Sequence, residues 1–475
     1  MFLGFLLLIA GLVWFVPLIE RARLPLLTAI VLMTGTVFGP QFFAADGPLQ
    51  VSIDRVLFAL LCVIAFFSLR GTTASLPKAN AADWLVAAWV LWLGYRAISG
   101  EVPAKSSPAG TWMFYILMPA LTYTIVRSAR WEQRDLRRVE FAMLILGLYL
   151  ALTAVFESRG WYSLVFPKFV ADETHWEFFG RGRGPLLNPS ANGIVMTIAL
   201  AVAAVRGLRA TRIGRIGYGI VSVLMLLGLY ATLTRSVWIG ALLALVIVFW
   251  QVTPRWSKVL AVCSCVLIAG FAASGLKDEL LRLKRDKNLS AADAEKSIQL
   301  RPLLAIIAFE MIKDAPLAGH GFGHYFQAVP PYYATRGYDM PLENARGYNQ
   351  HNVLLSLGVD SGLIGLSLFA AMLFIWIRSG WQLSKDLDEL PVHRHAGLIG
   401  VAGIAGYLVS GMFQDVTIMP MINMFLFFLG GCIVSLRYAS EASLTTPSAS
   451  AAAAIRSTGD QETAVVDEPF QPSAC

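Results

Sequence analysis

Charged residues are scarce in this chain. Only 15% of its 475 residues are Asp, Glu, Lys or Arg, whereas 56% are hydrophobic. A water-soluble domain usually contains about 25% charged residues. This composition excludes an ordinary soluble domain and indicates an integral membrane protein. The net charge of +7 needs no nucleic-acid partner, because Lys and Arg in cytoplasmic loops account for most of it.

Cysteine and histidine are also sparse. The five Cys residues are scattered and predict no disulfide framework. Of the six His residues, His320 and His324 have a spacing that could bind zinc on a helix. The glycines around them disfavour a helix, so we expect neither a metal nor another cofactor. The Cys residues, which we interpret as small apolar fillers, are Cys62, Cys263, Cys265, Cys432 and Cys475.

Long apolar runs recur through most of the sequence. A helix needs about 20 apolar residues to cross a hydrocarbon core. The first run has no basic residue before it and no convincing cleavage site, so we interpret it as a retained helix rather than a signal peptide. The fold class predicted is all-α, a polytopic membrane bundle of about 12–13 transmembrane helices. The expected spans are 2–19, 24–43, 55–69, 83–99, 112–126, 139–156, 189–205, 216–233, 236–251, 257–275, 353–377, 396–413 and 418–436.

Basic residues collect in alternate loops. Loop 127–138 contains five Arg, and loop 206–215 contains four with no acidic residue. Positive loops stay on the cytoplasmic side, which predicts an external N-terminus and a cytoplasmic C-terminus. The chain then divides into transmembrane helices 1–10 (1–275), a large, partly helical periplasmic loop (276–352), transmembrane helices 11–13 (353–438) and a tail (439–475). The tail is rich in Ala, Ser and Thr, so we expect it to be disordered and cytoplasmic.

Several arginines are predicted to face outward, against this charge rule. Guanidinium groups suit phosphate because their planar fork offers paired donors at any working pH. Arg235 lies in a short turn at or near membrane depth, where a charge is usually functional or paired. Its alternative role is to reach lipid headgroups and anchor the turn. Arg181 and Arg183 are flanked by glycines that let backbone approach a ligand, although an ordinary surface loop would have the same composition.

Arg301 precedes Pro302, a residue suited to the first turn of a helix. Residues 303–313 have the apolar spacing of an amphipathic helix. The pattern predicts Arg301 near the N-terminus of that helix, where backbone donors favour an anion. The alternative is an arginine that merely flanks a surface helix.

His351 begins the hydrophobic segment that follows the large loop. A histidine that titrates near neutrality can take a proton from a sugar hydroxyl, although a lone interfacial histidine is more often structural. The small residues Ser356, Gly358, Ser361, Gly362 and Gly365 predict close helix packing beneath it. Asp415, in the short outer loop between the last two spans, is a candidate to orient His351 or an arginine, or to cap a helix.

These motifs resemble a known family. The run Asp-x-Pro-Leu-x-Gly-x-Gly-x-Gly at 314–323 is followed by His351-Asn352 and by the pair Gly362 and Gly365. Over about residues 175–435 the chain is similar to the membrane O-antigen ligase and polymerase superfamily, which includes bacterial protein O-oligosaccharyltransferases. Thr234-Arg235-Ser236 resembles the family's short arginine-containing turn, and residues 188–192 resemble its Asn-Pro segment.

The resemblance implies a GT-C-like fold and a metal-independent, inverting glycosyltransferase at the periplasmic face of the bacterial inner membrane. Its donor would be an oligosaccharide or polysaccharide on a polyprenyl diphosphate, normally undecaprenyl diphosphate. Arg235 and Arg301 would hold the diphosphate and stabilise the charge of the leaving group, with Arg181 and Arg183 as further candidates. His351 would be the general base, or would help to bind the donor.

The acceptor separates the functions that remain open. An O-antigen ligase, the function we expect in lipopolysaccharide assembly, would use lipid A core. A polymerase of O-antigen or exopolysaccharide would use another repeat unit, and a protein O-oligosaccharyltransferase would use a protein hydroxyl. A non-enzymatic transporter of lipid-linked glycan would need charged or broken helices near the midplane, whereas the polar residues here concentrate at the outer boundary.

Overall fold

The structure is a computed structural model that describes residues 23–45, 51–71, 78–99, 107–251, 254, 258, 291–334, 338 and 340–445. The predicted span 2–19, the predicted span 257–275 apart from residue 258, residues 276–290 of the predicted loop and the tail beyond 445 lie outside these residues. The α-helices are α2 (Leu24–Val37), α3 (Ile53–Gly71), α4 (Ala81–Ile98), α5 (Pro108–Trp112), α6 (Met118–Ser128), α7 (Gln133–Arg159), α8 (Pro189–Arg209), α9 (Arg212–Ala231), α10 (Arg235–Trp250), α13 (Ala291–Asp314), α14 (Tyr325–Ala328), α15 (Val353–Lys385), α16 (Pro391–Gly411) and α17 (Pro420–Thr445).

Helices account for the predicted spans that the structure describes. Within the described ranges, six helical segments are long and apolar enough to cross a membrane: 108–128, 133–159, 189–209, 212–231, 353–385 and 420–438. A π-helical turn, η1 (Met113–Leu117), joins α5 to α6, and short 3₁₀ turns occur at η2 (Tyr162–Leu164), η3 (Lys168–Ala171), η4 (Pro330–Ala334) and η5 (Leu342–Ala345). One small antiparallel pair, β1 (Ala44–Ala45) and β2 (Val51–Ser52), lies among them. The predicted all-α, polytopic membrane class is confirmed.

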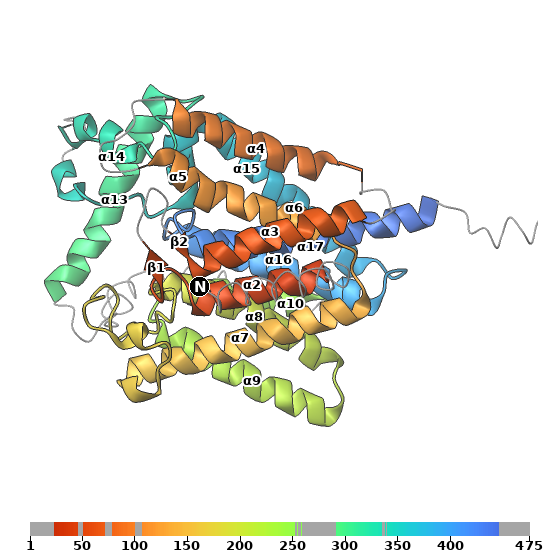
Figure 1. Ribbon diagram of the computed structural model, residues 1–475. Helices are drawn as coiled ribbons and strands as arrows, with labels where there is room; N and C mark the ends of the chain where they lie inside the picture. The colour runs from red at the N-terminus through yellow and green to blue at the C-terminus, as the bar shows by residue number, and fades with distance from the viewer. Residues whose placement is uncertain are drawn as a thin grey trace, which may run out of the picture.

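Ion pairs gather the arginine-rich loops at one end of the bundle. Arg23, which precedes α2, bonds Glu132 at 2.7 Å and Asp135 at 2.8 Å beside the start of α7. The 78–80 segment joins the same end, because Arg127 donates to the carbonyl oxygen of Lys78. The loops predicted to be cytoplasmic therefore meet on one side, while α13 and α14 lie at the opposite end of the long helices (Figure 1). The membrane side of each end stays a prediction.

Burial identifies the centre and the rim of the bundle. Helices α8 and α17 are largely enclosed by neighbours, whereas α9 is largely exposed and lies at the edge of the molecule (Figure 1). The exposed face of α9 presents apolar side chains, including those of Ile213, Ile216 and Ile220. Water would not favour such a face, so it is the surface expected to meet lipid.

A break in α15 is the main feature that the hydrophobic pattern does not predict. Gly362 lies inside the helix with φ 65° and ψ −169°, a conformation that L-residues with a Cβ rarely adopt. Residues of the glycine-rich run bond to the interrupted backbone: Leu363 donates to the carbonyl of Pro316 at 2.8 Å, and His320 donates to that of Val359 at 2.7 Å. The predicted role of Gly362 in close helix packing is therefore wrong. It allows a loop to insert at a helix break.

Arg301 also differs from its predicted position. Helix α13 begins at Ala291, so Arg301 and Pro302 lie in its interior rather than at its first turn. Arg301 therefore does not lie at the N-terminus of its own helix. The amphipathic part of the prediction is correct, because Leu303, Leu304 and Ile307 are buried in a separate outer core that packs on η5.

Helix α17 extends to Thr445, past the predicted end of the last span. Residues 439–445 therefore belong to the helix and not to a disordered tail. The side chain of Ser435, near this end, donates to the carbonyl of Ala129 at 3.3 Å. The last helix is thus held against the segment that follows α6.

Candidate functional site

The turn between α9 and α10 is held in place by Arg181. Its guanidinium donates to the carbonyls of Thr232 and Leu233 and, at 2.7 Å, to the hydroxyl of Thr234. The amide of Gly182 adds a bond to the carbonyl of Ala231 at 2.9 Å. Arg235 follows as the first residue of α10. These contacts of Arg181 therefore position the turn that presents Arg235. A direct substrate contact by Arg181 stays a prediction.

Arg183 occupies the inside of the neighbouring 160–188 loop. It is fully buried, and its terminal nitrogens donate to the backbone carbonyls of His175, Glu177, Val170 and Asp172. Burial lowers the pKa of its guanidinium, while the carboxylate of Glu157, 3.9 Å away, acts in the opposite direction. These contacts give Arg183 a structural role in the loop. Its role as a substrate contact stays a prediction.

Arg235 and Arg301 lie near each other although 65 residues separate their positions in the sequence. Burial, followed by the positive charge of Arg235, lowers the pKa of Arg301. Both side chains are half-buried. Two like charges in a partly desolvated site repel each other, so the pair favours an anion with more than one charge between them.

His351 is connected to this pair through the loop between α16 and α17. The next residue, Asn352, caps α15 by accepting from the amide of Leu354 at 2.8 Å, and its side-chain nitrogen donates to the carbonyl of Met412 at 3.1 Å. The adjacent ring of Phe413 lies 5.8 Å from the Cζ atom of Arg301. The segment 412–413 therefore contacts both Asn352, next to His351, and Arg301. The structure gathers Arg235, Arg301 and His351 at one end of the bundle.

Asp415 lies in the same loop but is bound to hydroxyl groups. Its carboxylate accepts from Ser356 Oγ at 2.6 Å and from the backbone and hydroxyl of Thr417. Burial raises its pKa, and these hydrogen bonds only partly offset that effect. The contacts join α15 to the loop beside Phe413. An orienting role toward His351 stays a prediction.

Three side chains near the site were not predicted from the sequence. The side chain of Gln350 is buried, and within the described residues its amide nitrogen has no hydrogen-bond partner. Arg96, at the end of α4, donates to the carbonyl of Gly319 at 2.9 Å, and Trp92 donates to that of Ser361 at 3.0 Å. Helix α4 therefore supports the break in α15. Its sequence reveals only hydrophobicity, which does not indicate this role.

The two histidines with a zinc-like spacing point to different backbone groups. A ring nitrogen of His320 lies 2.9 Å from the carbonyl of Met311, and one of His324 lies 3.1 Å from that of Phe322. Hydrogen bonds to neighbouring backbone thus account for both side chains.

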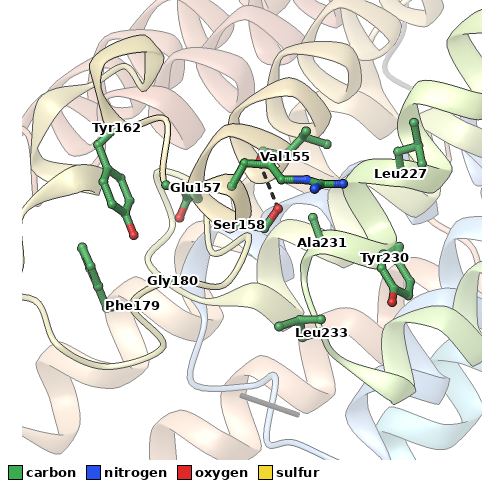
Figure 2. Close-up of a pocket in the computed structure, with 12 residues that line it drawn as sticks. Val155, Glu157, Ser158, Tyr162, Phe179, Gly180, Leu227, Tyr230, Ala231 and Leu233 are labelled. Carbon is green, nitrogen blue, oxygen red and sulfur yellow. Dashed lines mark hydrogen bonds between the residues drawn. The ribbon is translucent and has the colours of Figure 1, made fainter. Parts of the chain in front are cut away.

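A cavity of about 530 Å³ opens beside the arginine-bearing turn. Tyr162 and Phe179 lie on one side of it, with Leu227 and Tyr230 on the other (Figure 2). Leu233, two residues before Arg235, also lines it. Leu227 and Tyr230 belong to the exposed face of α9, so the cavity adjoins the surface expected to meet lipid.

Two charged side chains, Glu157 and Arg159, line the cavity together with its apolar and aromatic residues. Its carboxylate, Glu157, already accepts from the amides of Gly184 at 2.9 Å and Arg183 at 3.3 Å. The rings of Tyr162 and Phe179 stack at 5.1 Å between centroids. A mainly apolar, aromatic space next to a cationic site suits a ligand that is part hydrocarbon and part anion.

Comparison with known proteins agrees with the motifs. The family model described as O-antigen ligase matches residues 220–370, a range that contains Arg235, Arg301 and His351. This match confirms the predicted resemblance to the O-antigen ligase and polymerase superfamily and supports a glycosyltransferase-like function. No curated protein matches the chain.

Proposed function

We propose that the protein transfers a glycan from a polyprenyl diphosphate to an acceptor hydroxyl, as an O-antigen ligase does in lipopolysaccharide assembly. One observation carries the proposal: two half-buried arginines, Arg235 and Arg301, lie close enough to repel each other, within the segment that matches the O-antigen ligase family. Asn352, next to His351, bonds to the loop whose Phe413 ring faces Arg301. A diphosphate would relieve the repulsion by binding both guanidinium groups. The chain contributes all three side chains, without a metal in this scheme.

Each of these side chains has a defined part in the proposed reaction. His351 takes the proton of the acceptor hydroxyl as the oxygen attacks the anomeric carbon. The bond from that carbon to the diphosphate oxygen breaks, and its electron pair remains on the diphosphate. Arg235 and Arg301 stabilise the growing negative charge. Attack opposite the leaving group inverts the anomeric centre.

The lipid chain of the donor is assigned to the aromatic cavity. Leu227 and Tyr230 connect the cavity with the exposed apolar face of α9, and Leu233 brings it next to the turn of Arg235. A polyprenyl chain could thus remain in contact with apolar surface while its diphosphate reaches the arginines. The proposal places this end of the bundle at the periplasmic face of the inner membrane.

The test compares transfer by single variants in membranes supplied with lipid-linked glycan. We expect His351→Ala and Arg301→Ala each to lower the rate by about 10²–10³-fold, the usual effect of removing a group that stabilises a transition state. Arg346→Ala is the matched control, because Arg346 is an exposed arginine of the same outer region and should retain activity. Near-normal glycan ladders from His351→Ala or Arg301→Ala, with protein still in the membrane, would contradict the proposal.

A deletion strain distinguishes the possible acceptors. Loss of all capped lipopolysaccharide, with lipid-linked polymer accumulating, would identify a ligase. A band with a single repeat unit would identify a polymerase, which shares the donor and the chemistry. Changed glycoproteins or missing exopolysaccharide would indicate one of the other acceptors.

A further inference from the structure

A second, smaller cavity lies at the end of the bundle opposite to His351. It has a volume of about 100 Å³ and is lined by the ends of α8, α10, α15 and α16, through Arg209, Gln251, Ser384 and His395. Helix α10 begins at Arg235 and has 16 residues. At 1.5 Å per residue this places the cavity about 24 Å from the proposed transfer site, so it is a separate site.

His395 is the unusual group in this cavity. Its side chain is nine-tenths buried, with a relative exposure of 9%, and within the described part of the chain neither ring nitrogen has a hydrogen-bond partner. Buried polar atoms are nearly always paired, with protein or with another bound group. Both nitrogens are enclosed by neighbouring atoms, so a polar ligand in the cavity would pair with the imidazole once the ring turns toward it.

The charges around His395 specify what kind of ligand. Arg209 and Arg394 also line the cavity. The nearby Arg206 is neutralised by Glu140 at 2.9 Å, whereas among the described residues no carboxylate forms an ion pair with Arg209 or Arg394. Arg394 donates to the carbonyl of Ser384 at 3.4 Å, a long contact that leaves its other nitrogens available. The cavity is thus positive and rich in donors, which favours an anion.

The volume limits the size of that anion. A water molecule takes about 30 Å³ of liquid volume, so 100 Å³ holds about three waters. This is room for one tetrahedral oxyanion. Arginine pairs with phosphate oxygens through two parallel hydrogen bonds.

We propose that this cavity binds a single phosphate group, held by Arg209, Arg394 and His395. The phosphate belongs either to the headgroup of an anionic lipid or to a free phosphate ion, since both present the same oxygens. The site is independent of the proposed glycan transfer. Its position at the arginine-rich end fits a group at the polar boundary of a membrane.

The experiment uses the full chain purified in detergent and two probes. Native mass spectrometry measures retention of phosphatidylglycerol against phosphatidylcholine, and thermal unfolding measures stabilisation by inorganic phosphate. We expect Arg394→Gln and Arg209→Gln each to weaken binding about tenfold, because each removes a charge-assisted hydrogen bond. The matched control is Arg212→Gln, an exposed arginine that follows α8 and does not line the cavity; it should bind as the wild type does.

The two measurements, lipid retention and stabilisation by phosphate, identify the source of the phosphate. Selective retention of phosphatidylglycerol that is lost in Arg394→Gln supports a lipid headgroup, and a rise in unfolding temperature with phosphate that is lost in the same variant supports the free ion. If Arg394→Gln fails to fold, the exposed Arg209→Gln provides the same comparison. Equal binding by the wild type and both cavity variants, or no binding of either probe by the wild type, would overturn the proposal.

Discussion

At the scale of single residues, the proposed site places two like charges where they disfavour each other. Arg301 is half-buried, and both burial and Arg235 lower its pKa. A fold that needed only stability would not retain such a pair. Active sites commonly give up stability for function, and a bound diphosphate would offset the repulsion.

Replacing Arg301 should therefore separate stability from activity. Without substrate, we expect Arg301→Met to stabilise the folded protein by up to about 1 kcal/mol, the scale of a single charge interaction. For a chain of 475 residues this raises the unfolding temperature by about 1 °C. The same variant should lose glycan transfer. Thermal unfolding in detergent and a transfer assay provide the two measurements. A marked fall in unfolding temperature would instead show that Arg301 is structural.

Asp415 should make stability depend on pH. Its folded-state pKa is raised by burial above the usual value of 3.8, so the folded protein holds this proton more tightly than the unfolded chain does. The resulting stabilisation is complete below the unfolded pKa and is lost as pH rises through the folded pKa. Asp415→Asn, which stays neutral, should remove this part of the pH dependence. Unfolding temperatures measured from pH 4 upward test it, and parallel curves for variant and wild type would contradict it.

At the scale of elements, the break in α15 is where sequence and structure differ most. Apolar residues continue through 353–377, and a hydrophobic run of this length predicts a single uninterrupted helix. The pair Gly362 and Gly365 has the spacing of a helix-packing motif. Nothing local reveals that the backbone amides and carbonyls near Gly362 are bonded to residues 316–321, because that pairing depends on tertiary contacts.

The site residues show the same limit of prediction from sequence: their identity can be predicted, but their tertiary contacts cannot. The identity of Arg235, Arg301 and His351 as candidates came from charge, turn chemistry and motif, which a sequence displays. The position of Arg301 within its helix could not be predicted in this way. Proline prefers the first turn of a helix, which predicts a helix start at Pro302, but α13 begins earlier and contains Pro302 in its interior. The hydrogen bonds that bury Arg183 could not be predicted from the sequence either. Arg183 donates to backbone carbonyls of a folded loop, and backbone carbonyls are present at every residue, so they give no sequence pattern.

Gly362→Ala tests the importance of the helix break. An added Cβ would lie 2.2 Å from the carbonyl oxygen of Leu317, and the backbone has φ 65°. Strain of this kind costs about 1–3 kcal/mol before the clash is counted, so we expect a fall in unfolding temperature of at least several degrees and loss of transfer. Gly217→Ala in α9 is the control, because a Cβ there meets nothing within 4 Å. Equal stability of the two variants would show that the break is not needed.

At the scale of the whole molecule, function depends on which end faces outward. The ion pairs of Arg23, and the bond from Arg127 to the carbonyl of Lys78, bring the basic loops to one end. Arg235, Arg301 and His351 lie at the other. Charge statistics assign the basic end to the cytoplasm. The proposed mechanism requires this orientation, because the lipid-linked donor and the acceptor are expected at the periplasmic face.

Labelling of single cysteines can decide the orientation. Leu317 beside the glycine-rich run is 65% exposed, and Leu387 between α15 and α16 at the basic end is 80% exposed. In a background without the native cysteines, we expect a membrane-impermeant maleimide to label Leu317→Cys in intact cells and Leu387→Cys only after permeabilisation. The permeabilised sample controls for reactivity at both positions. The reverse pattern would place the arginine pair in the cytoplasm, where transfer to a periplasmic acceptor could not occur, while leaving the phosphate cavity at the other end untouched.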